Sequence, residues 1–409
     1  MVSLLPAILV VFVLASLFKI AFIYHVLYVL VAVALLARAW ASQAAGRLSF
    51  LRRVEARALW GETLSMRVEL RNRGRLPIPW LRLHDRLPIE LGAPAVLERA
   101  ISLGPGQTAS YRTDLQCRQR GWYQLGPFSV DTGDVLGLNL LRREFATDQR
   151  LLVYPKILPL PSLGLPSRTP FGDVRTQQPL YEDPARVMGV RDYQPGDSQR
   201  RIHWRTSAAL GRLQVKKLEP AMTLQTIVVL DLDPGAYERG ATHYASELAI
   251  TVAASLASHL VGLRQEVGLL TNGHDPGTQG EADAGPLYLP ARKGRAQLTR
   301  ILDTLARVQT RAGDPLARVL ATEIGRLGWG ATVVVVCGQE TGELTGALTR
   351  LRRAGFAVAL VLVSQRSPYA QPGGAAALGV PVHNVWRESD LDGGDPGPRR
   401  RAVQLARPS

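Results

Sequence analysis

Apolar residues run almost without interruption from Leu4 to Ala37, and Lys19 is the only charged residue among them. As one helix, these positions would extend about 51 Å, which exceeds a hydrocarbon core of about 30 Å. A lysine at the bilayer centre costs about 2.5 to 3.5 kcal/mol, so Lys19 is expected near a membrane surface. The pattern favours a helical hairpin that turns near Lys19, and a single span over Ile20–Ala39 stays open. We assign residues 1–40 to a transmembrane anchor.

Beyond the anchor, apolar and polar residues alternate with a period of two. Leu64, Met66, Val68 and Leu70 alternate with polar neighbours, which is typical of a half-buried strand. Further short strands, separated by Pro and Gly turn signals, are predicted over Trp80–His84, Ala109–Cys117, Tyr123–Val130 and Leu151–Tyr154. This spacing predicts a β-sandwich over residues 55–155.

Residues 156–219 contain a predicted linker followed by a conspicuous motif. The stretch 156–190 is rich in Pro and Gly and shows little periodicity, which indicates a surface linker. The motif begins at Arg191 and continues through a short helix that is expected to end at Gly211.

From residue 220 onward, continuous apolar runs alternate with helical patterns. Apolar runs indicate buried strands, and the alternation predicts a doubly wound parallel sheet over residues 220–388. The runs are Thr226–Leu232, Val267–Leu270, Thr332–Cys337 and Ala357–Val363, and the expected helices are Tyr244–Leu263, Gly294–Gln309, Pro315–Leu327 and Glu343–Ala354. Residues 389–409 are expected to form a disordered tail. The predicted fold class is therefore multi-domain: transmembrane helices, a β-sandwich and an α/β domain.

Composition narrows the class of protein. With 46% apolar and 20% charged residues, the chain is neither disordered nor fibrous. Cys117 and Cys337 are its two cysteines, which excludes a disulfide framework and a CxxC zinc site. No GxxxxGK[ST] or GxGxxG nucleotide-binding signature occurs.

The chain is strongly basic, with 49 Lys and Arg against 34 Asp and Glu and a formal charge of +15. Such a charge favours anionic neighbours such as lipid headgroups, nucleic acid or acidic proteins. Aromatic residues make up 6% and do not alternate with the basic clusters, so we expect no nucleic-acid partner. Five arginines follow the anchor closely, namely Arg38, Arg47, Arg52, Arg53 and Arg57. By the positive-inside rule, the rest of the chain is expected on the cytoplasmic side of the plasma membrane.

The motif over residues 191–209 combines a turn with a basic helix. Pro195 and Gly196 suit a turn, and Asp197 or Ser198 is expected to cap the following helix. Residues 191–217 carry seven basic and two acidic side chains, a local charge of +5.

Two interpretations of the motif stay open. In the first, Arg191 and Arg205 hold the turn carboxylates in ion pairs, and Trp204 lies in the core. In the second, the motif is a surface that binds an anion or a partner. His203 is expected to be packed or hydrogen-bonded, because no second His or Cys stands at metal-ligand spacing. The candidate residues are Arg191, Tyr193, Pro195, Gly196, Asp197, Arg201, His203, Trp204 and Arg205.

The motif, read as R-D-Y-x-P-G-D-S-x-R-x-I-H-W-R-T-S-A, resembles the signature of the bacterial family called domain of unknown function 58. Further segments match in the same order: Asn72-Arg73-Gly74, Arg120-Gly121-Trp122-Tyr123, Asp134-Val135-Leu136-Gly137 and Val153-Tyr154-Pro155. The resemblance implies a membrane-anchored protein whose C-terminal half is similar to a von Willebrand factor A domain. It also implies a MoxR-type AAA+ ATPase as partner and no settled enzymatic activity. We therefore expect a non-enzymatic scaffold that assembles or activates other proteins.

A metal-dependent adhesion module is the alternative. The resemblance implies a Mg²⁺ site after the first strand of the α/β domain, with an Asp and two hydroxyls in D-x-S-x-S. Here Asp231 is kept, Asp233 replaces the first hydroxyl and Gly235 replaces the second. Asp231 and Asp233 are thus candidate metal ligands, and capping of the next helix is their structural alternative. Otherwise no cofactor is expected.

A more remote alternative is a phosphatase. An apolar strand that ends in Asp-x-Asp also resembles the nucleophile motif of haloacid dehalogenase-type phosphatases. That chemistry requires a Thr where Gly235 stands and an acidic pair after a later strand, and neither is present.

Overall fold

The computed structural model describes residues 4–18, 21–94, 96–134, 140–160, 182–194, 197–220, 225–277, 285–328, 330–363 and 374–391. Backbone contacts divide the chain into two compact units, Met1–Lys156 with Leu302–Arg307, and Ile157–Ile301 with Val308–Ser409. We call them the N-terminal unit and the C-terminal unit and describe each separately. The predicted tail lies outside the described residues from residue 392 onward.

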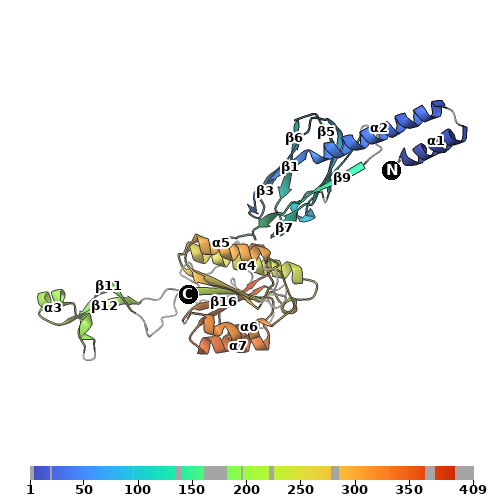
Figure 1. Ribbon diagram of the computed structural model, residues 1–409. Helices are drawn as coiled ribbons and strands as arrows, with labels where there is room; N and C mark the ends of the chain where they lie inside the picture. The colour runs from blue at the N-terminus through green and yellow to red at the C-terminus, as the bar shows by residue number, and fades with distance from the viewer. Residues whose placement is uncertain are drawn as a thin grey trace. The chain divides into compact units, whose positions relative to one another are not determined.

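Two apolar helices begin the N-terminal unit. Helix α1 (Leu4–Phe18) packs beside α2 (Ala21–Gly46) in an antiparallel pair (Figure 1). The segment Ala21–Gln43 has a mean hydropathy of 2.0, and 6% of its most apolar window is buried. Its length and composition suit a membrane span. The pair has the form expected of a hairpin, while Lys19 lies outside the described residues.

Ten strands follow in the described part of this unit and form three sheets, ordered β1-β3-β6, β2-β10-β7 and β5-β4-β8-β9. The period-two pattern predicted a half-buried strand, and in β3 buried positions do alternate with more exposed ones. One hydrophobic core joins the sheets, and its largest fully buried side chains include Phe128 and Met66. The strands are β1 (Leu48–Arg53), β2 (Arg57–Ala58), β3 (Thr63–Asn72), β4 (Ile78–Arg86), β5 (Val96–Leu103), β6 (Thr108–Gln116), β7 (Gly121–Leu125), β8 (Phe128–Gly133), β9 (Leu140–Phe145) and β10 (Gln149–Val153).

The motif lies in a small substructure of its own. Strands β11 (Glu182–Asp192) and β12 (Gln214–Pro220) pair antiparallel, and helix α3 (Trp204–Leu210) lies between them in sequence (Figure 1). The stretch 156–190 was predicted to be a linker, but β11 begins at Glu182. Irregular register between Asp183 and Gly189 explains why no period-two pattern marks this strand.

A six-stranded sheet forms the centre of the C-terminal unit, ordered β15-β14-β13-β16-β17-β18. Its interior strands are continuous apolar runs, as predicted from the sequence. The strands are β13 (Gln225–Leu230), β14 (Glu266–Thr271), β15 (Leu287–Arg292), β16 (Thr332–Cys337), β17 (Ala357–Val363) and β18 (Val382–Val385). Strand β15 runs antiparallel to β14, so the sheet is mixed, and the expectation of an all-parallel sheet was wrong at this edge.

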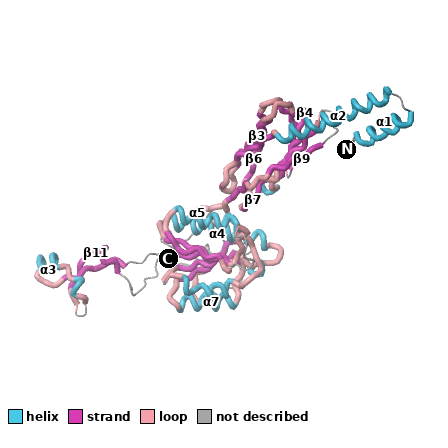
Figure 2. Tube along the Cα trace, in the orientation of Figure 1, coloured by secondary structure: helices cyan, strands magenta, loops and turns pink. Residues whose placement is uncertain are grey.

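Helices cover both faces of the sheet (Figure 2). Helix α4 lies on one face, and α6 and α7 lie on the other, where Leu320 and Leu348 pack into the core with Val333. Although α4 has the length and apolarity of a membrane span, 72% of its most apolar window is buried inside the unit, so it is a core helix. The helices are α4 (Thr242–Gly262), α6 (Leu316–Glu323), α7 (Gly342–Arg353), α8 (Gly374–Ala377) and α5 (Arg295–Arg307), which the division into units splits at Leu302.

Candidate functional site

The turn of the motif is closed by a two-pronged ion pair. The Arg191 Nη1 and Nη2 atoms donate to Asp197 Oδ2 and Oδ1 at 2.7 and 2.6 Å. The backbone N–H of Gln194 donates to the same carboxylate at 2.9 Å. These bonds, from Arg191 first, lower the pKa of Asp197 below its ordinary value. The lock predicted for Arg191 is therefore present.

Helix α3 begins at an unusual cap. The His203 Nδ1 atom accepts the backbone N–H of Thr206 at 3.2 Å, so His203 caps the helix in place of the predicted Asp197 or Ser198. The His203 backbone N–H donates to the carbonyl of Gln214 at 2.8 Å, which ties the cap to β12. Gly211 ends the helix with φ of 68°, the left-handed conformation that favours glycine.

A buried polar contact fixes α3 on the hairpin. The Gln214 backbone N–H donates to Ser207 Oγ at 2.8 Å, and Ser207 Oγ donates to the His203 carbonyl at 3.0 Å. The Gln214 side chain donates to Asp192 and is 3% exposed. Because its polar contacts are internal and specific, this substructure holds α3 in one orientation.

Trp204 does not lie in a core. Its side chain is 67% exposed, which contradicts the prediction that it is buried. The hairpin is too small for a second layer: within the described residues 189–194 and 197–216, the buried apolar side chains are Ile202 and Val215. Leu210 and Leu213 are exposed as well, at 53% and 45%. The substructure therefore exposes three large apolar side chains.

The expected role of Arg205 in the lock is also wrong. Asp192, the second acidic residue of the motif, forms an ion pair with Arg212 at 3.1 Å. Asp197 forms its ion pair with Arg191, so neither carboxylate is paired with Arg205. Arg205 is exposed and takes part in no ion pair with a described residue. Both acidic groups are thus neutralised internally, and Arg201 and Arg205 are exposed.

The other predicted motif residues have simpler positions. The Tyr193 backbone N–H donates to the Leu213 carbonyl at 3.0 Å and extends the pairing of the hairpin. Arg201 is exposed at the end of a short 3-10 helix, Gln199–Arg201. Pro195 and Gly196 lie outside the described residues. We define the motif surface as Trp204, Arg205, Leu210 and Leu213 with Arg201.

The second candidate site, at Asp231, follows strand β13. Asp231 is 5% exposed, and its Oδ1 atom accepts Asn272 Nδ2–H at 2.8 Å and the Asp233 backbone N–H at 3.1 Å. Burial raises the pKa of Asp231 to about 6, and these two hydrogen bonds oppose the rise. Asp233 Oδ1 accepts the backbone N–H of Gly235 at 3.2 Å and caps the 3-10 helix Pro234–Ala236.

These contacts do not fit a magnesium site of the adhesion type. One oxygen of Asp231 and one of Asp233 already accept protein N–H groups, and Gly235 supplies no side-chain oxygen. Hard divalent cations require several oxygen ligands. Within the described residues, no group of three or more His, Cys, Asp and Glu is arranged to hold a metal ion. The geometry instead gives Asp233 the capping role.

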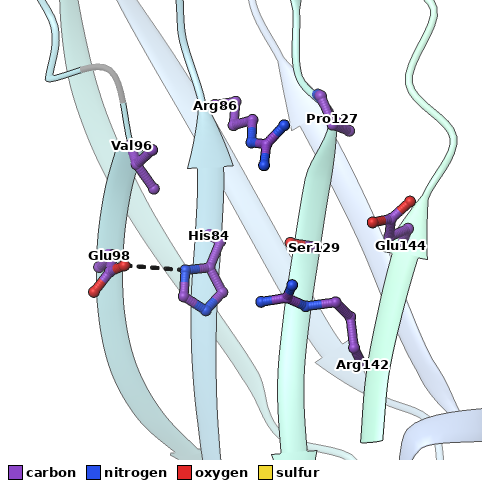
Figure 3. A pocket seen from close by; sticks show the side chains of 8 residues that line it. All are labelled: His84, Arg86, Val96, Glu98, Pro127, Ser129, Arg142 and Glu144. Carbon is purple, nitrogen blue, oxygen red and sulfur yellow. Dashed lines mark ion pairs between the residues drawn. The ribbon is translucent and has the colours of Figure 1, made fainter.

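A pocket of about 280 Å³ lies on the outer surface of the sheet β5-β4-β8-β9 (Figure 3). His84 on β4 faces Glu98 Oε1 at 3.3 Å and Asp131 Oδ2 at 3.0 Å. Arg142 on β9 donates to both oxygens of Asp131 at 2.7 and 3.0 Å, and its bonds lower the pKa of Asp131. These four side chains join all four strands and satisfy one another, so they stabilise the sheet. No local signal in the sequence marks this cluster, because it depends on strand register.

Comparison with known proteins gives one family and one relative. A sequence profile described as "Protein of unknown function DUF58" matches residues 189–369, which include the motif and most of the six-stranded sheet. An uncharacterized protein of Bacillus subtilis (strain 168), YeaD, is 26% identical over 291 residues, which are 69% of this chain and 68% of that protein.

Solved structures show only weak similarity. The CARDB domain of a Pyrococcus furiosus protein, in complex with di-metal ions, covers 26% of this chain and 86% of its own, at 13% identity and a TM-score of 0.19. A β-glucosidase from Listeria innocua covers 26% of this chain and 16% of its own, at 10% identity and a TM-score of 0.16. At these TM-scores the similarity does not identify a shared fold.

Proposed function

We propose that this chain, which belongs to the DUF58 family of proteins of unknown function, is a membrane-anchored interaction protein and not an enzyme. In this proposal, α1 and α2 hold it in the plasma membrane, and the strands of the N-terminal unit and the whole C-terminal unit lie in the cytoplasm. The C-terminal unit acts as a von Willebrand A-like scaffold. Its partner is a MoxR-type AAA+ ATPase, as the family resemblance implies.

The motif surface is the observation that carries this proposal. A solvent-exposed Trp204 beside Arg205 has the composition of an interaction hot spot, since Trp and Arg dominate binding energy at protein interfaces. The internal hydrogen bonds of His203 and Ser207 hold α3 in place, which reduces the entropy lost on binding. Rigid presentation favours recognition of a protein surface over general adsorption.

Charge indicates the kind of surface that fits. Asp192 and Asp197 are paired with Arg212 and Arg191 within the motif, and the exposed Arg205 takes part in no ion pair with a described residue. An acidic surface with a pocket that accepts an indole is complementary to this arrangement. We therefore expect the contact surface of the partner to be acidic.

Crosslinking in native membranes tests the proposal. Tagged full-length protein carries a photo-crosslinking residue at the exposed Ala208, one helical turn after Trp204. We compare this protein with Trp204→Ala and Arg205→Glu versions, and with Tyr244→Ala as a matched control, because Tyr244 is an aromatic residue that is 46% exposed in α4. Captured proteins are identified by mass spectrometry.

We expect a MoxR-type ATPase to be captured by the parent protein and by the Tyr244 variant, with at least a tenfold loss in the Trp204 and Arg205 variants. Hydrogen exchange at the Gln214 amide shows whether the motif is still folded in each variant. Equal capture by all four proteins would place the contact elsewhere. Absence of the ATPase from every sample, with the motif folded, would reject the partnership.

A further inference from the structure

The sheet of the C-terminal unit has a topological switch point. From β13 the chain proceeds to β14 on one side, and from β16 it proceeds to β17 on the other, so the direction reverses between the neighbours β13 and β16. In open α/β sheets, ligands bind in the crevice outside the carboxyl ends of the strands at such a point. Asp231 and Gly338, which directly follow β13 and β16, border this crevice.

Tyr237 fills the space between these two strand ends. Its side chain is 4% exposed, and its hydroxyl donates to the Asp231 carbonyl. A Cβ atom at Gly338 would collide with Tyr237 Cδ1 and with the Ala236 carbonyl oxygen. The absence of a side chain at Gly338 is therefore what admits the tyrosine ring and the loop that carries it.

Asn272, which follows β14, closes the other side of Asp231. Its side chain donates to Asp231 Oδ1 at 2.8 Å and accepts the Leu232 backbone N–H at 2.7 Å. The segments that leave three neighbouring strands are thus joined by one set of side-chain contacts. Asp231 is the common partner of Tyr237 and Asn272.

We infer that Tyr237 is a built-in occupant of the switch point, so that the crevice is closed by the chain itself. The carboxyl ends of β13 and β16 then receive neither a divalent cation nor a small ligand. Recognition of any partner by this unit is independent of divalent cations and uses another surface. This inference rests on the contacts of Tyr237, Asn272 and Gly338, and it does not depend on the proposed function.

Removal of the ring tests the inference with the full-length protein in detergent micelles. A buried aromatic side chain replaced by alanine leaves an apolar cavity, and such a cavity binds small aromatic molecules. We expect Tyr237→Ala to lower the thermal midpoint by about 10 °C. The probe 4-methylphenol should raise the midpoint of this variant and leave the wild type unchanged. Tyr244→Ala, at the exposed tyrosine, is the matched control. Its thermal midpoint should equal that of the wild type and should not change with 4-methylphenol.

Two results would overturn the closed crevice. One is a rise of the wild-type midpoint with 4-methylphenol that the Tyr237→Phe variant shares, because the site would then be open with the ring in place. The other is saturable heat on titration of the wild type with MgCl₂ that disappears in Asp231→Asn. If Tyr237→Ala does not fold, Tyr237→Phe keeps the ring and loses one hydrogen bond. It should remain folded and give no Mg²⁺ heat.

Discussion

Arg52 and Asp85 form an ion pair in the interior of the N-terminal unit, with both side chains fully excluded from solvent. Arg52 Nη2 donates to Asp85 Oδ1, and Arg52 Nη1 donates to the Leu125 carbonyl at 3.0 Å. The pair connects β1 with β4, which belong to different sheets. Asp85 Oδ2 and Arg52 Nε have no hydrogen-bond partner, so the two buried charges depend on each other.

Removal of one partner should cost far more than removal of both. Asp85→Ala leaves the Arg52 charge buried and unpaired, and we expect a loss of about 3 to 5 kcal/mol in the local free energy of opening. The double variant Arg52→Met, Asp85→Leu replaces the pair with apolar groups and should lie within about 1 kcal/mol of the wild type or above it. Hydrogen exchange of the β1 and β4 amides measures both values. Equal losses in the single and double variants would show that the pair itself provides the stability.

The motif lock gives a prediction at one amide. Asp197→Asn removes the charge-assisted bonds from Arg191, so the Gln194 N–H, which donates to this carboxylate, should exchange faster at neutral pH. Because the pKa of Asp197 is lowered in the folded protein, the lock persists down to the ordinary value of about 4 and is lost only as pH falls through the lowered pKa. The Gln214 amide, bonded to Ser207, is the internal reference. Unchanged exchange at Gln194 would contradict the lock.

The buried carboxyl group of Asp231 should make the stability of the C-terminal unit depend on pH. Burial raises its pKa to about 6, so the folded state binds the proton more tightly than the unfolded state, in which the pKa is about 3.9. The resulting stabilisation is complete below about pH 4 and is lost as pH rises to about 6. Asp231→Asn stays neutral and should therefore exceed the wild type by up to about 3 kcal/mol above pH 7, with a much smaller difference at pH 4. Unfolding midpoints of both proteins from pH 4 to 8 test this; a difference that does not change with pH would refute it.

Membrane retention should depend on α2. Val29 is 61% exposed within the span Ala21–Gln43, and an arginine near the middle of a span costs about 2.5 to 3.5 kcal/mol on insertion scales. Val29→Arg should reduce the fraction of protein that resists carbonate extraction from membranes. Val29→Ala, which keeps the position apolar, should leave that fraction unchanged. Full retention of the arginine variant would argue against a span over this segment.

The sequence predicted elements whose signal is local. The alternation from Leu64 to Leu70 produced β3, and continuous apolar runs produced β13, β14, β16 and β17. Strand β15 escaped prediction because Leu287–Arg292 is a half-exposed edge strand in which Pro290 ends the apolar run after three residues. Edge strands tolerate proline because one side of the backbone is not paired.

The candidate sites show where sequence reasoning fails. Arg191 and Asp197 were predicted correctly because they are close in sequence and of opposite charge. Trp204 was misplaced because apolarity predicts burial only where a core exists to receive the side chain. Tyr237 and Asn272 were missed because their roles depend on which strand ends become neighbours. The one sequence feature that points to this arrangement is Gly338, a glycine directly after a buried apolar strand.

The connection between the anchor and the first sheet has a mechanical consequence. Only Arg47 separates the end of α2 from the start of β1, and one residue spans at most about 3.6 Å. Trp40 Nε1 also donates at 3.1 Å to the carbonyl of Pro77, the residue directly before β4, which gives the helix a second attachment to the rest of the N-terminal unit. In an anchored protein, this connection is rigid and does not act as a flexible linker. The strands of the N-terminal unit cannot reorient freely with respect to α2, so in an anchored protein they turn with this helix about the membrane normal.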